Sequence, residues 1–391
     1  MNATSGNRRT RDPPQRMELP AVTSLRGLAA LTVLLFHGGN LALAYAPGTN
    51  MGSVLLNIWS RGYLAVDLFF FLSGFVLTHV YGSHLAHERN WRVIGGFLWA
   101  RFCRIYPASA FAASICALQF ILGNVPFPAG VSFQGQLICS LTLMQVPWLD
   151  PILLNPPSWS ISAEFYAYLM FPFLVPLLLQ LTTSAAVALG VALLTAIAVS
   201  NQGFDDYHRG SGWPVLIRSV PEFTVGILAY RCYSLRVFGS FWKDDTTLAG
   251  VTALIVAAGV MQAADGVIIM LLLGLLMACV GNAGRLSRFI EVRPLRSLGE
   301  VSYSVYIFQA PIFILLASLA DPLVAYGYSR AWFALLSAPV VLGGGVLVHR
   351  CVDVPARAML RRLPDRAMAF AAAYRGVKPP RSVATEHGPD A

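Results

Sequence analysis

The chain has 391 residues, of which 56% are hydrophobic and only 12% are charged, and its mean hydropathy is +0.61. These values exclude an ordinary soluble domain and predict an all-α integral membrane protein. The net charge of +9 is not attached to a soluble basic module, so it argues against a nucleic-acid-binding protein and favours contact with membrane lipids.

Apolar stretches of about twenty residues predict the transmembrane helices. In chain order they lie at 19–45, 62–82, 98–122, 158–180, 184–200, 214–234, 246–262, 265–283, 301–320 and 332–350. A weaker stretch, 133–149, would be an eleventh span, but it would invert the charge pattern of everything after it. We therefore interpret 123–157 as one long outer connection.

The lysines and arginines give this arrangement an orientation. With about ten spans and both termini in the cytoplasm, most of the 28 basic residues fall on the inner side, as the positive-inside rule requires. We expect three parts, namely a basic disordered segment at 1–17, a membrane domain at 18–353 and a basic cytoplasmic tail at 354–391.

The first predicted helix carries two ionisable residues, Arg26 and His37. Eleven residues make three helical turns, so both side chains lie on one face, roughly 16 Å apart along the axis. Ionisable groups inside a bilayer are costly and usually face a cavity or a pathway. The alternative is structural: Arg26 reaches a lipid headgroup and His37 bonds a backbone carbonyl.

Two carboxylates enter the membrane at a depth similar to that of His37. Asp67 lies near the outer end of the second span, and Glu164 lies near the outer end of the fourth. A histidine beside a carboxylate is a general acid/base arrangement that suits acyl transfer to an alcohol. The same groups would also serve as a proton relay in a transporter, and Asp67 alone would serve as a structural tie.

A pair of arginines marks the cytoplasmic mouth of the third span. Arg101 and Arg104 are three residues apart and share one helical face, and paired guanidinium groups suit phosphate recognition. Positive-inside anchoring is the alternative for either one. Together with Arg26 they form a basic path toward His37, which would suit a donor with phosphates at one end and a reactive group on a long arm.

Five motifs in order resemble the acyltransferase 3 family of bacterial membrane O-acyltransferases, over about 18–353. The motifs are LRGLAALTVLLFH, GYLAVDLFFFLSGFVLT, RFCRIYP, PPSWSISAEFYAYLMFP and LGEVSYSVYIFQAP. The resemblance implies transfer of an acyl group, usually acetyl, from cytoplasmic acyl-coenzyme A to a hydroxyl of a saccharide such as an exopolysaccharide, lipopolysaccharide or other exported glycan. It places the chain in the bacterial cytoplasmic membrane, with acyl-coenzyme A as co-substrate and no tightly bound cofactor or metal.

The same resemblance assigns roles to residues. It implies that His37 is the catalytic base, that Arg26 orients the donor or stabilises charge, and that Arg101 and Arg104 contact coenzyme A. Glu164 is implied as a functional member of its motif, with Asp67 as support for His37. Candidate substrate-binding residues in the same motif as Glu164 are Trp159 and Ser160.

One position departs from the family pattern. Gln309 stands where many relatives carry a histidine before the proline of the ninth span. An amide forms hydrogen bonds but does not titrate, so a proton-transfer role at this position is in doubt.

Two other classes of function compete with an enzyme. A polytopic transporter or a flippase of lipid-linked saccharide would also bury charges, although 200–391 contains no second copy of the first-helix pattern. A membrane scaffold would tolerate apolar replacements of Arg26 and His37. The acceptor, the length of the acyl chain and the oligomeric state stay open.

Overall fold

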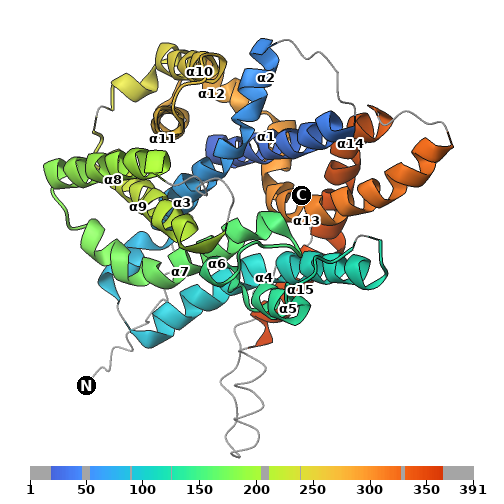
Figure 1. The fold of residues 1–391 in the computed structure, drawn as a ribbon. Helices are drawn as coiled ribbons and strands as arrows, with labels where there is room; N and C mark the ends of the chain where they lie inside the picture. The colour runs from blue at the N-terminus through green and yellow to red at the C-terminus, as the bar shows by residue number, and fades with distance from the viewer. Residues whose placement is uncertain are drawn as a thin grey trace, which may run out of the picture.

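The computed structural model describes residues 19–45, 53–88, 90–124, 126–203, 211–237, 239–326 and 331–363. Every regular element in these ranges is a helix, and they contain no strand (Figure 1). The all-α prediction is therefore confirmed. The expected segment at 1–17 and most of the expected tail lie outside the described residues.

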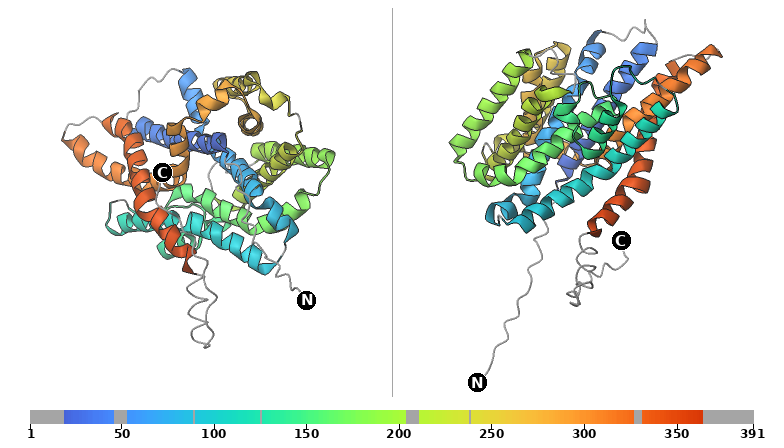
Figure 2. Two further views of the ribbon diagram at one scale, coloured as in Figure 1. Left: turned by 180° about the vertical axis from the view of Figure 1, so that it is seen from behind. Right: turned by 60° about the horizontal axis from the view of Figure 1, so that its bottom comes forward.

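Ten longer helices match the ten predicted spans one to one. They are α1 (Pro20–Tyr45), α3 (Ala65–His87), α4 (Trp91–Ile121), α7 (Trp159–Leu178), α8 (Thr183–Gly203), α9 (Gly212–Ser234), α10 (Asp245–Val260), α11 (Asp265–Gly281), α13 (Arg293–Ala325) and α14 (Ala331–Val348). They run side by side in one bundle (Figure 2). Seven helical stretches among the described residues are long and apolar enough to cross a membrane.

The other three predicted spans do not meet that criterion, because two are too short and one carries charged residues. α10 and α11 have 16 and 17 residues, and about 20 are needed to cross the hydrocarbon core upright. α9 is long enough but carries Arg218, Glu222 and Arg231.

Short elements connect the long helices. These are α2 (Ser53–Ser60), α5 (Phe133–Thr142), α6 (Gln145–Trp148), α12 (Arg285–Ile290), α15 (Val354–Arg361), three 3₁₀ turns at Gly62–Leu64, Pro156–Ser158 and Phe241–Lys243, and a π-helix at His349–Asp353. The ambiguous stretch 133–149 folds as α5 and α6, which are too short to span. Its interpretation as part of a connection is confirmed.

Close glycine contacts fix the position of two helix pairs. A Cβ on Gly27 of α1 would lie 2.7 Å from the backbone nitrogen of Gly299 of α13. A Cβ on Gly74 of α3 would lie 2.0 Å from the carbonyl oxygen of Phe223 of α9. Only glycine allows backbones to approach this closely, as in other packed membrane helices. The two contacts set α1 against α13 and α3 against α9, which positions the polar groups described next.

Aromatic side chains fill the centre between α3, α4, α7 and α9. Phe71, Phe75, Phe171 and Phe223 are all fully buried. The ring of Phe171 stacks on Phe97 at 5.1 Å between centroids and meets Phe223 edge-on at 5.9 Å. Offset and edge-on contacts are the favoured aromatic geometries. This packing holds α7, which carries Glu164, against α4 and α9.

Candidate active site

Arg26 and Glu164 line the same interior space. Two small cavities of about 40 Å³ and about 50 Å³ share Arg26, Ser73, Glu164 and Tyr303 in their walls. Each has room for a few water molecules. The Glu164 carboxylate accepts hydrogen bonds from Ser73 Oγ at 2.6 Å and from the Tyr168 hydroxyl at 2.5 Å. The structure therefore groups Glu164 with Arg26.

The second cavity extends to the arginine pair of α4. Both Arg101 and Arg104 line it together with Arg26. Arg101 donates to the Tyr81 hydroxyl at 3.0 Å and lies over its ring, and Arg104 lies over the ring of Tyr303 at 5.0 Å. Three guanidinium groups thus share one small cavity with a single carboxylate, and His37, the expected end of the basic path, does not line it. Such an excess of positive charge favours an anionic ligand.

The first cavity ends at a layer of hydroxyl groups and aromatic rings. Ser160 Oγ and the Tyr306 hydroxyl lie 2.8 Å apart, and each lies within hydrogen-bond distance of the Pro157 carbonyl. The ring of Phe69 meets Tyr306 edge-on at 5.8 Å. Ser160 therefore lines the first cavity, and its role in substrate binding stays a prediction. The sequence analysis did not single out Tyr303 or Tyr306.

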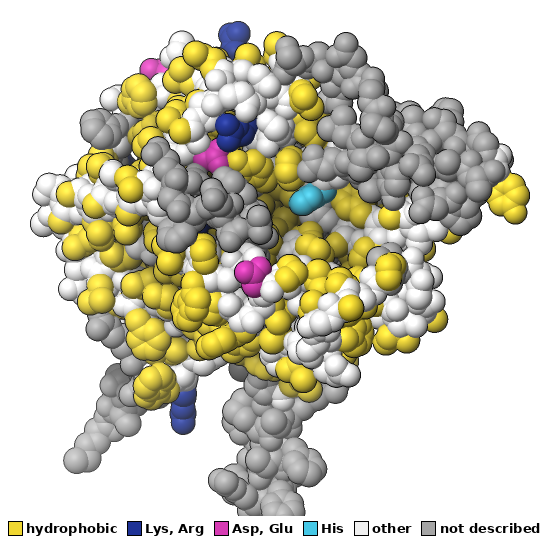
Figure 3. Space-filling view, in the orientation of Figure 1, with side chains coloured by type: hydrophobic (Ala, Val, Ile, Leu, Met, Phe, Trp, Pro, Cys, Tyr) yellow, Lys and Arg dark blue, Asp and Glu magenta, His cyan; other side chains and the backbone are white. Residues whose placement is uncertain are grey.

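His37 lies elsewhere along α1. It is half-buried, its ring meets that of Phe36 edge-on at 5.2 Å, and it lines neither cavity. Three helical turns separate it from Arg26 on the same face. The face drawn in Figure 3 is hollowed, and a histidine side chain is exposed within the hollow. The expected convergence of His37 with Asp67 and Glu164 is not what the contacts show.

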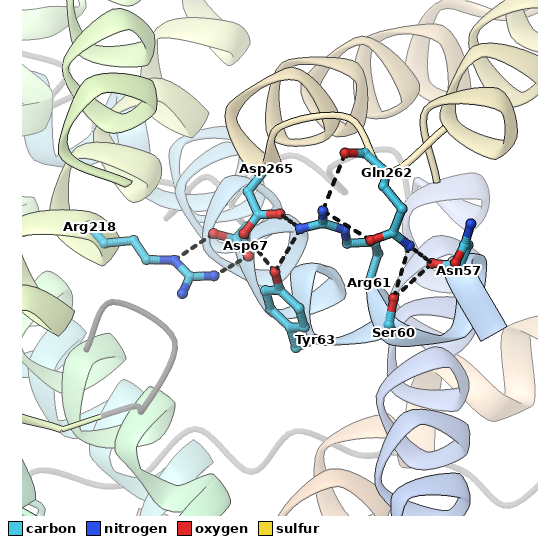
Figure 4. A network of polar contacts seen from close by, with 8 residues as sticks. All are labelled: Asn57, Ser60, Arg61, Tyr63, Asp67, Arg218, Gln262 and Asp265. Atoms are coloured by element: carbon cyan, nitrogen blue, oxygen red, sulfur yellow. Dashed lines mark hydrogen bonds and ion pairs between the residues drawn. The ribbon is translucent and has the colours of Figure 1, made fainter. Parts of the chain in front are cut away.

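Asp67 forms its hydrogen bonds with α9. Both of its oxygens accept from the guanidinium of Arg218, with 2.7 Å between Arg218 Nε and Asp67 Oδ1 (Figure 4). Glu222 Oε1 is 3.4 Å from the same Nε, and all three side chains are buried. A guanidinium group that donates two hydrogen bonds to one carboxylate forms a strong, directional pair. Asp67 thus supports Arg218, where the sequence analysis expected support of His37.

Trp159 contacts the buried triad of Asp67, Arg218 and Glu222. The Arg218 guanidinium lies 5.9 Å from the centre of the Trp159 ring, a cation–π distance. Trp159 does not line either cavity. The sequence signal for the triad was present, because Arg218 and Glu222 are four residues apart in one apolar stretch and so face the same way.

A second polar network joins the segment just before α3 to the start of α11. Arg61 forms an ion pair with Asp265, whose carboxylate also accepts a hydrogen bond from the Tyr63 hydroxyl at 2.6 Å (Figure 4). The ring of Tyr63 meets Phe36 edge-on at 5.7 Å. This network therefore braces the part of α1 that carries His37.

Gln309 is buried, and neither its amide nitrogen nor its amide oxygen has a hydrogen-bond partner among the described residues. It lies nearly one helical turn beyond Tyr306 on α13. An amide cannot titrate, so the doubt about proton transfer at this position stands.

Comparisons with known proteins agree with the motifs. A family model described as "Acyltransferase domain" matches residues 19–350, most of the chain. Acyltransferase MdmB of Streptomyces mycarofaciens is 27% identical over 90% of this chain and 94% of its own length. Peptidoglycan O-acetyltransferase OatA of Listeria monocytogenes is 23% identical over 88% of this chain and 56% of its own length. No solved structure is significantly similar.

The chain thus covers nearly all of MdmB and about half of OatA. Family model, relatives and helical architecture together make it a multi-pass membrane acyltransferase with bacterial homologues. The chain belongs to the acyltransferase 3 family.

Proposed function

We propose that the protein transfers an acetyl group from cytoplasmic acetyl-coenzyme A to a hydroxyl of an exported saccharide, in the bacterial cytoplasmic membrane. The observation that carries the proposal is the row of Arg101, Arg104 and Arg26 along one cavity, on a path toward the helix face that carries His37. The name of the relative OatA, a peptidoglycan O-acetyltransferase, supports an acetyl group and a saccharide acceptor.

The donor binds with its phosphates at Arg101 and Arg104, at the end of the bundle predicted to be cytoplasmic. Guanidinium groups recognise phosphate oxygens through paired hydrogen bonds. The pantetheine arm then points past Arg26. Since the cavities here hold only a few waters, the arm enters by side-chain or helix movement that widens them.

The reaction is a direct acyl transfer in this proposal. His37 removes the proton of the acceptor hydroxyl as its oxygen attacks the thioester carbon. The carbon–oxygen bond forms, the carbon–sulfur bond breaks, and His37 returns the proton to the departing thiolate. Arg26, three helical turns from His37 on the same face, orients the pantetheine arm so that the thioester reaches His37. Glu164 lines the same cavity as Arg26 and supplies the one carboxylate there.

The test uses membranes containing the protein, incubated with radiolabelled acetyl-coenzyme A, followed by fractionation of the glycans. The proposal predicts label in a saccharide fraction only when the protein is present, released by mild alkali as an ester is. Label that accumulates in no fraction, with the protein verified as inserted, would contradict the proposal.

A further inference from the structure

Two arginines from distant parts of the chain meet on one ring and one carboxylate. The guanidinium carbon of Arg104 lies 5.0 Å from the centre of the Tyr303 ring, and that of Arg357 lies 6.0 Å from it. Both also approach Asp353, Arg104 Nη1 at 3.9 Å and Arg357 in a tighter ion pair. Arg357 therefore lies beside Arg104 and Tyr303, two residues that line the second cavity.

The local sequence explains why Arg357 reaches this place. The π-helix that ends α14 carries Asp353, and α15 follows it directly, with Pro355 in its first turn where proline is tolerated. Asp353 and Arg357 are four residues apart and so share a helix face. α15 lies beyond residue 350, where the family match ends, so that match assigns nothing to Arg357.

The charges of this cluster are not balanced. Asp353 is fully buried, and besides the two arginines it contacts Ser304 Oγ at 3.1 Å and His349 Nδ1 at 3.4 Å. One carboxylate thus faces two guanidinium groups. Nη1 of Arg104 and Nε of Arg357 are buried without a hydrogen-bond acceptor among the described residues, and Oδ1 of Asp353 is buried there without a donor. Spare N–H donors together with surplus positive charge form a site for an oxyanion.

We propose that Arg357 is a third arginine of the phosphate site for the acyl donor, beside Arg101 and Arg104. This inference rests on the proposed function for the identity of the donor. Asp353 holds Arg104 and Arg357 at a fixed spacing, and the phosphate oxygens of coenzyme A take the N–H groups left over. Arg357 binds the donor without taking part in the bonds that form or break.

The test measures binding to the purified full-length protein by calorimetry, with coenzyme A and pantetheine as probes. Pantetheine has the arm but no phosphate. Arg357→Gln should weaken coenzyme A binding by about ten- to hundredfold, the effect of losing a charge-assisted hydrogen bond, and leave pantetheine unaffected. Arg350→Gln is the matched control, because it removes the same charge from an exposed position in the π-helix. That control should keep the wild-type affinity for coenzyme A.

Each outcome of these binding measurements either supports or overturns the inference. Unchanged coenzyme A affinity in Arg357→Gln, or equal weakening of both probes, would overturn the inference and leave the proposed function standing. Failure of the wild-type protein to bind coenzyme A would overturn both. If Arg357→Gln does not fold, Arg357→Lys keeps the charge opposite Asp353 but loses the guanidinium fork. That variant should bind coenzyme A several-fold more weakly, and wild-type affinity there would overturn the inference.

Discussion

The buried triad of Asp67, Arg218 and Glu222 predicts an unequal response to the loss of its members. The three side chains carry two potential negative charges and one positive charge, all out of contact with solvent. Arg218→Gln leaves two carboxylates without a cation, and breaking a buried ion pair from one side costs about 3–5 kcal/mol. Asp67→Asn leaves Arg218 with Glu222, already 3.4 Å away, so its cost is smaller, about 1–3 kcal/mol.

The assay is equilibrium unfolding in mixed detergent micelles, comparing the free energy of unfolding of each variant with that of the wild-type protein. Arg218→Gln should be the more destabilised of the two, by about 2 kcal/mol. Lower stability of Asp67→Asn than of Arg218→Gln, or a wild-type free energy of unfolding in Arg218→Gln, would contradict this prediction.

Three further predictions concern the cavity and the helix packing. Arg26→Gln should lower the transfer rate by about 10²-fold, because the donor arm is no longer held in the reactive position. A rate within a few-fold of wild type in the radiolabel assay would count against that role. Glu164→Gln should slow the same reaction by about tenfold or more. Ser73→Ala removes only a neutral hydrogen-bond donor to Glu164 and should slow it less. A larger loss of rate in Ser73→Ala than in Glu164→Gln would count against a role for the carboxylate. Gly74→Ala should reduce the yield of monodisperse protein on size-exclusion chromatography, because its Cβ would lie 2.0 Å from a backbone oxygen. Gly95→Ala is the control, since a Cβ on Gly95 meets nothing within 4 Å. Equal yields of the two variants would contradict the packing argument.

Much of the fold could be predicted because apolar length and charge placement are local properties of the sequence. Each of the ten predicted stretches has one long helix, and 133–149 does not span. The pair Arg101 and Arg104 shares a cavity with Arg26, although they belong to different helices. Their common position toward one end of the bundle was visible in the sequence.

The partners of the buried carboxylates could not be predicted in the same way. Depth in the membrane follows from residue number, but the direction in which a helix faces its neighbours depends on packing. The sequence predicts similar depths for Asp67 and His37, yet the close backbone contact at Gly74 turns Asp67 toward Arg218. Glu164 likewise faces Arg26 and Tyr168. Only for Arg218 and Glu222 does the sequence itself indicate a contact, because residues four apart lie on the same helix face.

The central claim is that His37 is the general base of an acyl transfer. It is tested most directly by the initial rate of transfer from radiolabelled acetyl-coenzyme A in proteoliposomes containing His37→Ala. His79→Ala is the matched control, since His79 lies on α3, contacts Tyr230 and lines neither cavity. We expect His37→Ala to fold and insert but to lose about 10²–10⁴ in rate, while the control stays near wild type. A near-normal rate in the His37→Ala protein would contradict this claim.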